Sequence, residues 1–261
     1  MDVLVVGLAA GGGVVLGDQL EVLVARTGVH RDLSWPWWVC QSCAQPSPWP
    51  AAVPIVGLPS RLKPCPKCAT RAEHRVRPVV LAVLCALAMG AFAARIGPHP
   101  VLASYLVLAP ALVALGAVDL ERLILPNRIL YPAGAAVAGL LVISSAVEGQ
   151  WGSLIRAVLG AVASFAVFFG VHLASPRGMG FGDVRLAGLV GLVTGWFGWG
   201  QVLAAFLAAF LLGAVVGLAV MAVSGQGRKT RVPFGPFLAL GAAASIVMGS
   251  PAVGALLHHR L

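Results

Sequence analysis

Charged side chains are scarce in this chain: only 10% of its 261 residues are Asp, Glu, Lys or Arg. A soluble globular domain carries about 25% charged residues, because its surface faces water. The deficit therefore excludes a soluble domain. Apolar residues make up 59% of the chain and the mean hydropathy is +0.92. Such a composition also excludes intrinsic disorder, so we predict a polytopic membrane protein.

Further absences in the sequence bear on nucleic-acid binding and on a signal peptide. Aromatic residues are only 7% of the chain and no helix is rich in Lys and Arg, so the net charge of +9 does not indicate a nucleic-acid partner. The first residues have no basic region and no small-residue cleavage site. We therefore interpret residues 3–24 as a retained helix and not as a signal peptide. The chain has no long internal repeat and no low-complexity tract.

Apolar runs predict an all-α protein with about eight transmembrane helices, since about 20 apolar residues cross the hydrocarbon core. The predicted spans are 3–24, 79–96, 101–118, 129–147, 153–174, 184–199, 201–223 and 236–257. Fifteen of the 18 Lys and Arg residues then fall on one side, which the positive-inside rule makes the cytoplasmic side of the cell's inner (plasma) membrane. We divide the chain into a first helix (1–24), a cytosolic module (25–78) and a seven-helix membrane core (79–261).

The cysteines favour a metal site in the cytosolic module. Cys40 and Cys43 form one C-x-x-C pair, Cys65 and Cys68 form another, and 21 residues separate the pairs. Four thiolates at this spacing can hold a tetrahedral Zn²⁺, much as in a zinc ribbon. We predict a structural zinc, because four cysteines fill the coordination shell; redox chemistry by one C-x-x-C pair is the alternative.

Two aspartates occur where a membrane protein avoids them. Asp119 ends the apolar run 106–119, and Asp183 stands at the start of the predicted span 184–199. An aspartate at the centre of a membrane helix costs about 2.5–3.5 kcal/mol, so a retained one indicates function. The predicted topology puts both at the same cytoplasmic depth. Two close carboxylates can share a proton, so that one acts as a base on water while the other polarises a carbonyl group.

Glycines precede the second aspartate. Gly178, Gly180 and Gly182 allow close backbone approach, which fits the mouth of a site that admits an extended peptide. The simpler alternative is that both aspartates cap helices at the membrane interface. A second alternative is an ion- or proton-coupled transporter that uses the same aspartates as proton carriers. A third is a structural component of a secretion machine that has lost its activity.

Three segments resemble the prepilin peptidases, also called type IV leader peptidases. They are the segment 116–132 around Asp119, the Gly-x-Gly-Asp element Gly180-Phe181-Gly182-Asp183, and the stretch 232–241, which contains Pro-Phe-Gly-Pro-Phe. They occur in the family's order, and the resemblance extends from about residue 40 to the end and includes the cysteine spacing. It implies a membrane aspartic endopeptidase in which Asp119 and Asp183 are the catalytic pair. We assign Gly180, Gly182 and Arg185 to substrate binding.

The resemblance also implies partners and a second activity. The substrates would be prepilins or pseudopilins, which lose a short basic leader on the cytoplasmic side. Many members then methylate the new N-terminus with S-adenosylmethionine. This chain departs from the family at residues 11–17, where a polar pattern is replaced by glycine and aliphatic residues, and at the residue after Pro78, where a glutamate is common. Arg185 and Asn127 stand where lysine and aspartate are usual. The methyl-transfer activity, the particular substrate and the oligomeric state stay open.

The zinc prediction is tested by metal analysis of the purified protein. We expect one zinc per chain in the wild type, because the two C-x-x-C pairs together supply a complete shell of four thiolates. Cys65→Ser should lose most of the bound zinc, whereas Cys85→Ser, which changes the cysteine outside the two pairs, should retain it. A wild-type protein purified without zinc would contradict the prediction.

Overall fold

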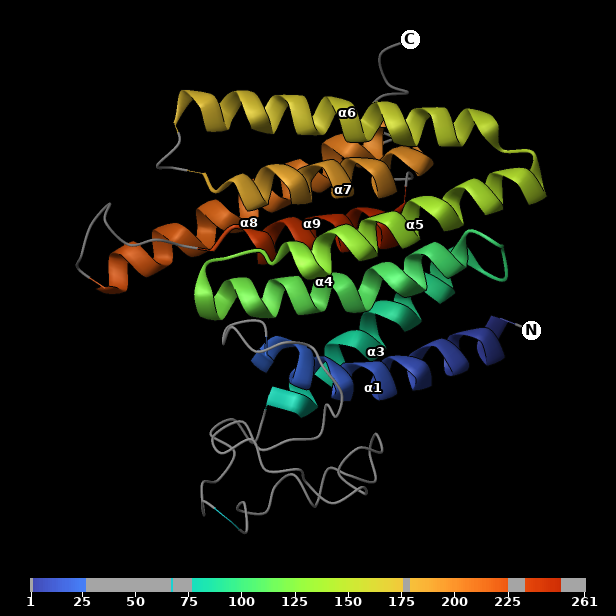
Figure 1. Cartoon of the computed structure of the whole chain (residues 1–261), viewed down its shortest axis with the longest axis horizontal. Helices are drawn as coiled ribbons and strands as arrows, with labels where there is room; N and C mark the ends of the chain where they lie inside the picture. The colour runs from blue at the N-terminus through green and yellow to red at the C-terminus, as the bar shows by residue number, and fades with distance from the viewer. Residues whose placement is uncertain (1, 27–66, 68–76, 176–178, 225–232, 250–261) are drawn as a thin grey trace. The chain divides into compact units, whose positions relative to one another are not determined.

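The computed structural model describes residues 2–26, 67, 77–175, 179–224 and 233–249. Within these ranges all regular structure is α-helical, and no strand occurs. Figure 1 labels the helices in chain order. Their bounds are α1 Asp2–Arg26, α3 Arg77–Ile96, α4 Leu102–Arg122, α5 Asn127–Glu148, α6 Trp151–Ala174, α7 Phe181–Phe197, α8 Trp199–Ser224 and α9 Gly235–Met248.

The all-α prediction is confirmed for the described residues, and each of the eight predicted spans overlaps one helix; residues 250–257 of the last predicted span lie outside the described ranges. Five helices, α3, α4, α5, α6 and α8, are long and apolar enough to cross a membrane. The chain is therefore a multi-pass membrane protein. The apolar parts of α1 and α9 are shorter, and α7 has 17 residues. The four cysteines of the predicted zinc module lie outside the described residues.

The chain divides into two compact units, Met1–Ala91 and Phe92–Leu261. In the first unit, α1 meets α3 through small residues. A Cβ atom at Gly13 would lie 2.6 Å from Cα of Ala86, and one at Gly17 would lie 2.4 Å from Cα of Ala82. Membrane helices associate by such close backbone contact, because burying apolar surface gives little gain in lipid.

The second unit is an antiparallel bundle in which α6 packs along α7 and α8 packs along α9, while α4 contacts both α5 and α9. Successive helices from α4 to α9 run in alternating directions (Figure 1). The α4–α5 and α6–α7 connections therefore meet the start of α9 at one end, which we call the Asp119 end. The opposite end, which we call the His99 end, holds the connections before α4, between α5 and α6, and between α7 and α8.

Small residues bring α6 and α7 into backbone contact. A Cβ atom at Gly160 would lie 2.6 Å from the carbonyl oxygen of Gly191, and one at Gly195 would lie 3.0 Å from the carbonyl oxygen of Arg156. Larger side chains at these positions would separate the helices. The glycines thus fix the distance between α6 and α7, and with it the position at which α7 begins.

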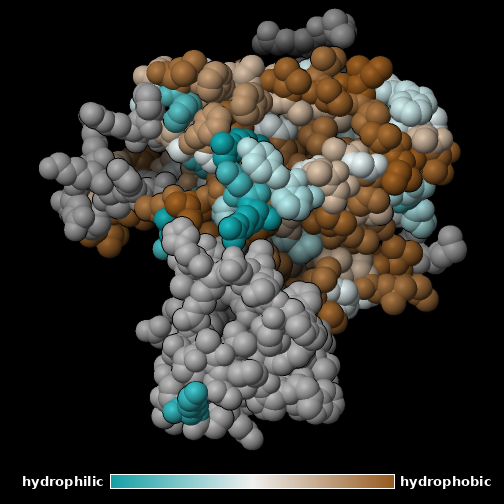
Figure 2. Space-filling view, in the orientation of Figure 1, coloured by the Kyte–Doolittle hydropathy of each residue, from teal (hydrophilic) through white to brown (hydrophobic). Residues whose placement is uncertain are grey.

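Apolar side chains cover much of the surface of the described helices on the face shown in Figure 2. The side chains of α8 are among the most exposed, including Leu203, Leu207, Leu211, Val215 and Leu218. Such a surface suits hydrocarbon, which cannot hydrogen-bond to polar side chains. The exposed apolar surface agrees with a bundle that is embedded in a bilayer.

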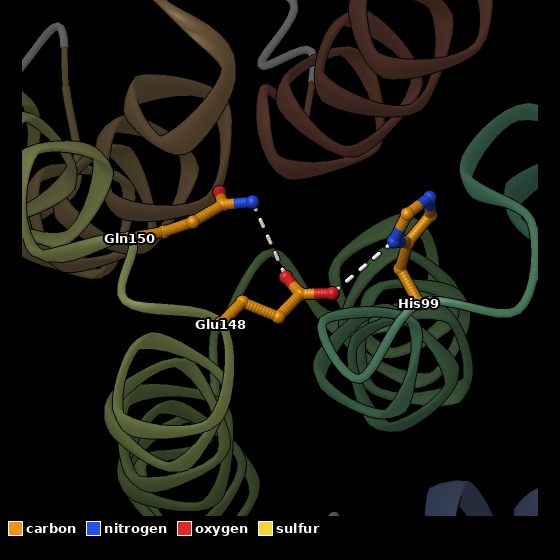
Figure 3. Close-up of polar contacts among 3 residues, drawn as sticks. All are labelled: His99, Glu148 and Gln150. Atoms are coloured by element: carbon orange, nitrogen blue, oxygen red, sulfur yellow. Dashed lines mark hydrogen bonds and ion pairs between the residues drawn. The ribbon is translucent and has the colours of Figure 1, made fainter.

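Polar contacts hold the connections at the His99 end. Nδ1 of His99 lies 3.1 Å from Oε1 of Glu148, and Nε2 of Gln150 donates to Oε2 of the same carboxylate at 3.3 Å (Figure 3). Nearby in the fold, Arg156 donates to the carbonyl oxygens of Gly195 and Trp196, where α7 ends. A cation at a helix C-terminus binds carbonyl groups that have no partner within the helix.

The packing of α6 on α7 predicts different effects of adding a methyl group at two glycines of α6. Gly160→Ala should destabilise the protein by about 1–3 kcal/mol, because its Cβ would overlap the backbone of α7. Gly170→Ala is the matched control: no atom lies within 4 Å of its Cβ position, so it should be neutral or stabilising by up to about 1 kcal/mol. Thermal unfolding in detergent measures both variants, and equal midpoints would contradict this account of the packing.

Candidate functional site

Asp119 lies in the last turn of α4 and is only 5% exposed. Its Oδ2 atom accepts a hydrogen bond of 2.9 Å from the backbone N–H of Gly235, the first residue of α9. The first N–H groups of a helix have no partner within the helix and carry a partial positive charge. The start of α9 therefore supplies a donor to a carboxylate that is removed from bulk water.

A side chain at position 235 would displace the Asp119 carboxylate. A Cβ atom there would lie 2.7 Å from Oδ2 of Asp119, which is closer than real Cβ atoms approach. Pro236 follows in the first turn of α9 and lies close to Gly116 of α4. The Pro-Phe-Gly-Pro-Phe stretch thus begins a helix whose first N–H points at Asp119. The sequence signalled this stretch as a motif, but the role of Gly235 as a donor was missed.

Asp183 lies in the first turn of α7 and is half-buried. The residue before the helix, Gly180, has extended backbone angles of φ −69° and ψ 144°. The backbone N–H of Asp183 donates to the carbonyl oxygen of Gly180 at 3.1 Å, and the Asp183 carboxylate lies against Gly180, since a Cβ atom at Gly180 would be 3.3 Å from Oδ2. The carboxylate thus reaches back to the residue that caps its own helix, as the third helical residue does in a capping box.

The two carboxylates are close enough to interact electrostatically. Asp183 lies outside the five spanning helices, and burial together with the charge of Asp119 raises the pKa of its carboxyl to about 6. The backbone of Gly180 acts in the opposite direction. The Asp183 carboxyl therefore keeps its proton up to a higher pH than an isolated aspartate does.

The α4–α5 connection, which follows Asp119, packs against the start of α7, which carries Asp183. Leu123 follows Asp119 by four residues and ends α4 in a left-handed conformation, with φ of 55°. Leu125 then packs against α7 so closely that a Cβ atom at Gly182 would lie 2.9 Å from Cβ of Leu125. Gly182 therefore lets the turn that follows Asp119 press against the turn that carries Asp183.

Arg185 connects the same two elements by a polar contact. Its guanidinium donates to Oδ1 of Asn127, the first residue of α5, at 2.5 Å. The guanidinium carbon also lies 4.4 Å from the ring centre of Phe181 and 5.6 Å from that of Tyr131. Cations are attracted to aromatic faces at these distances. Arg185 thus presents a positive charge two residues from Asp183.

Most of the predicted site residues meet at the Asp119 end. Asp119, Gly180, Gly182, Asp183 and Arg185 lie together there, on α4 and the beginning of α7. Gly178 lies outside the described residues, as do Cys40, Cys43, Cys65 and Cys68. Among the residues that the structure describes, no group of three or more His, Cys, Asp or Glu side chains could hold a metal ion.

Sequence comparisons identify the family. A model of the type IV leader peptidase family matches residues 106–218, which contain both aspartates. A prepilin leader peptidase/N-methyltransferase of Burkholderia pseudomallei (strain K96243) is 31% identical over 269 residues, covering 92% of this chain and 84% of the relative. One of Pseudomonas putida is 30% identical over 236 residues, covering 88% of this chain and 78% of the relative.

A more distant relative supports the same assignment. The prepilin leader peptidase/N-methyltransferase of Bacillus subtilis (strain 168) is 24% identical over 237 residues, covering 91% of this chain and 92% of the relative. No solved structure matches the chain significantly. The resemblance predicted from the three motifs is thus confirmed: this chain belongs to the type IV leader peptidase family and is a peptidase.

Proposed function

We propose that this peptidase is a membrane aspartic endopeptidase that removes the leader peptide of type IV prepilins or pseudopilins. The observation that carries the proposal is that Asp119 of α4 and Asp183 of α7 lie at one end of the bundle, where Leu125 from the connection after Asp119 packs against Gly182, the residue before Asp183. One ionised carboxylate takes a proton from water, and the water oxygen attacks the peptide carbonyl carbon. The other carboxyl, which is protonated, donates a hydrogen bond to the carbonyl oxygen and so polarises the carbonyl group. As the C–N bond breaks, the first carboxyl returns its proton to the leaving amine.

The neighbouring residues suit an extended peptide substrate. Gly180 places no side chain beside the Asp183 carboxylate, Gly182 admits Leu125, and Arg185 offers guanidinium N–H groups two residues after Asp183 in the chain. A prepilin would lay its apolar segment along the exposed apolar helices within the bilayer, with its leader at the Asp119 end. Asp119 and Asp183 would then lie beside the peptide bond that joins the leader to the apolar segment.

We propose that the Asp119 end faces the cytoplasm and that the protein resides in the inner (plasma) membrane. The support is the distribution of Lys and Arg, fifteen of 18 of which fall on that side of the predicted spans. Arg122, Arg128 and Arg185 are near the aspartates, whereas Arg95 and Arg156 belong to the His99 end. The leader would then be cut before the substrate's N-terminus crosses the bilayer.

Methyl transfer is a second candidate activity, since the relatives are named prepilin leader peptidase/N-methyltransferase. The stretch 11–17 of this chain has no polar side chain, and two of its glycines, Gly13 and Gly17, are used for contact with α3. We therefore propose peptidase activity for the described residues and assign none of them to S-adenosylmethionine. The mass of the mature substrate's N-terminal peptide reports both activities in one measurement.

Removing either carboxyl group tests the proposal. Asp119→Asn and Asp183→Asn should each lower the rate of prepilin cleavage by at least about 100-fold, because an amide cannot transfer the proton. Both variants should still insert into membranes. The measurement is the size shift of a prepilin incubated with purified membranes.

Glu148→Gln is the matched control, because it removes a carboxyl group at the His99 end and should cleave at the wild-type rate. Normal cleavage by either aspartate variant would overturn the proposal and favour a transporter that uses the same carboxylates, or a chain that only assembles with a secretion machine.

The role of α9 predicts a second effect on activity. Gly235→Ala should reduce kcat about 10-fold or more. Its Cβ would displace the Asp119 carboxylate from the backbone N–H at position 235, the one hydrogen-bond donor to this carboxylate in the described residues. Gly139→Ala is the control, since nothing lies within 4 Å of its Cβ position. Cleavage assays on both variants at matched protein levels measure the difference, and equal rates would show that α9 does not position Asp119.

A further inference from the structure

His172 lies near the end of α6, at the Asp119 end, and has no part in the proposed hydrolysis. Its ring is half-buried and lies 5.5 Å from the ring of Phe181, centre to centre. Nδ1 of His172 is 2.8 Å from the carbonyl oxygen of Met179. A carbonyl oxygen only accepts, so Nδ1 carries the proton in this contact. The side chain is thus held in one tautomer and one orientation between α6 and the start of α7.

The acceptor of this hydrogen bond belongs to the peptide group that also lies against Asp183. The carbonyl of Met179 and the N–H of Gly180 are the two ends of one planar unit. The carbonyl end accepts from His172, and the other end leads into Gly180, whose own carbonyl oxygen accepts the backbone N–H of Asp183. A Cβ atom at Gly180 would lie 3.3 Å from Oδ2 of Asp183, so this peptide group lies directly against the carboxylate.

We propose that His172 is a positioning residue for Asp183, acting through the peptide group between Met179 and Gly180. Without a partner for its carbonyl, this peptide group can rotate about the bonds that flank it, and the adjoining Gly180 offers little steric resistance to that rotation. Rotation would move the backbone of Gly180 from its place against the Asp183 carboxylate.

The inference rests on the proposed function, because it takes Asp183 to be a catalytic residue. A simpler interpretation is that His172 only fills space between α6 and α7 beside Phe181. The two interpretations differ in one respect: positioning needs a donor at the place of Nδ1, whereas packing needs only the volume of the ring.

Three substitutions at position 172 separate these interpretations. The side-chain amide nitrogen of asparagine can occupy the place of Nδ1, whereas that of glutamine reaches the place of Nε2. His172→Ala should lower kcat for prepilin cleavage about 10-fold, because the backbone that lies against the Asp183 carboxylate loses the hydrogen bond that holds it in place. KM should stay within about twofold, since His172 does not touch the substrate. His172→Asn should restore most of the lost rate, and His172→Gln should not.

His99→Ala, which alters a histidine at the opposite end of the bundle, is the control and should match the wild type. Wild-type kcat in His172→Ala would overturn the inference, as would equal rates for the Asn and Gln variants. A raised KM with unchanged kcat would make His172 a substrate contact instead. Cleavage by Asp183→Asn would remove the proposed function itself, and this outcome is distinct from the others because it does not depend on position 172.

Discussion

Both carboxylates of the candidate site lie against the beginnings of helices. Asp119 accepts a hydrogen bond from the backbone N–H of Gly235 at the start of α9, and Asp183 lies against Gly180, the residue before α7. Hydrocarbon offers no donors, so an ionisable group at membrane depth needs partners within the protein. Free N–H groups of helix N-termini meet this need without introducing a second charge. The alternating directions of the helices bring these N-termini to the same end of the bundle.

Small residues determine how closely these helix ends approach each other. Gly160 and Gly191 let α6 and α7 touch through their backbones, and Gly182 admits Leu125 from the α4–α5 connection. Gly235 lets α9 reach Asp119 in the same way. In a bilayer, close packing replaces the hydrophobic effect as the source of helix association. The residues that stabilise the bundle are therefore the same ones that set the geometry of the carboxyl pair.

The eight helices were predictable because hydropathy and segment length directly reflect the thickness of the bilayer. Asp119 and Asp183 were predictable as candidate site residues because carboxylates are costly in such segments, and the motifs around them indicated the family. The donor role of Gly235 was not predictable from its own type, since a glycine carries no side chain to signal it. The contact of His172 was not predictable either, because a single histidine in an apolar helix does not reveal which acceptor lies 2.8 Å away.

The sequence by itself determined the class of the protein, the order of its helices and the identity of its two unusual acids, because these follow from local composition and short motifs. Tertiary structure alone decided that Gly235 donates to Asp119, that Arg185 binds Asn127, and that His172 binds the carbonyl oxygen of Met179. These contacts join different helices or a helix and a connection. They depend on crossing distances set by glycines on neighbouring helices, and no single segment of the chain encodes such a distance.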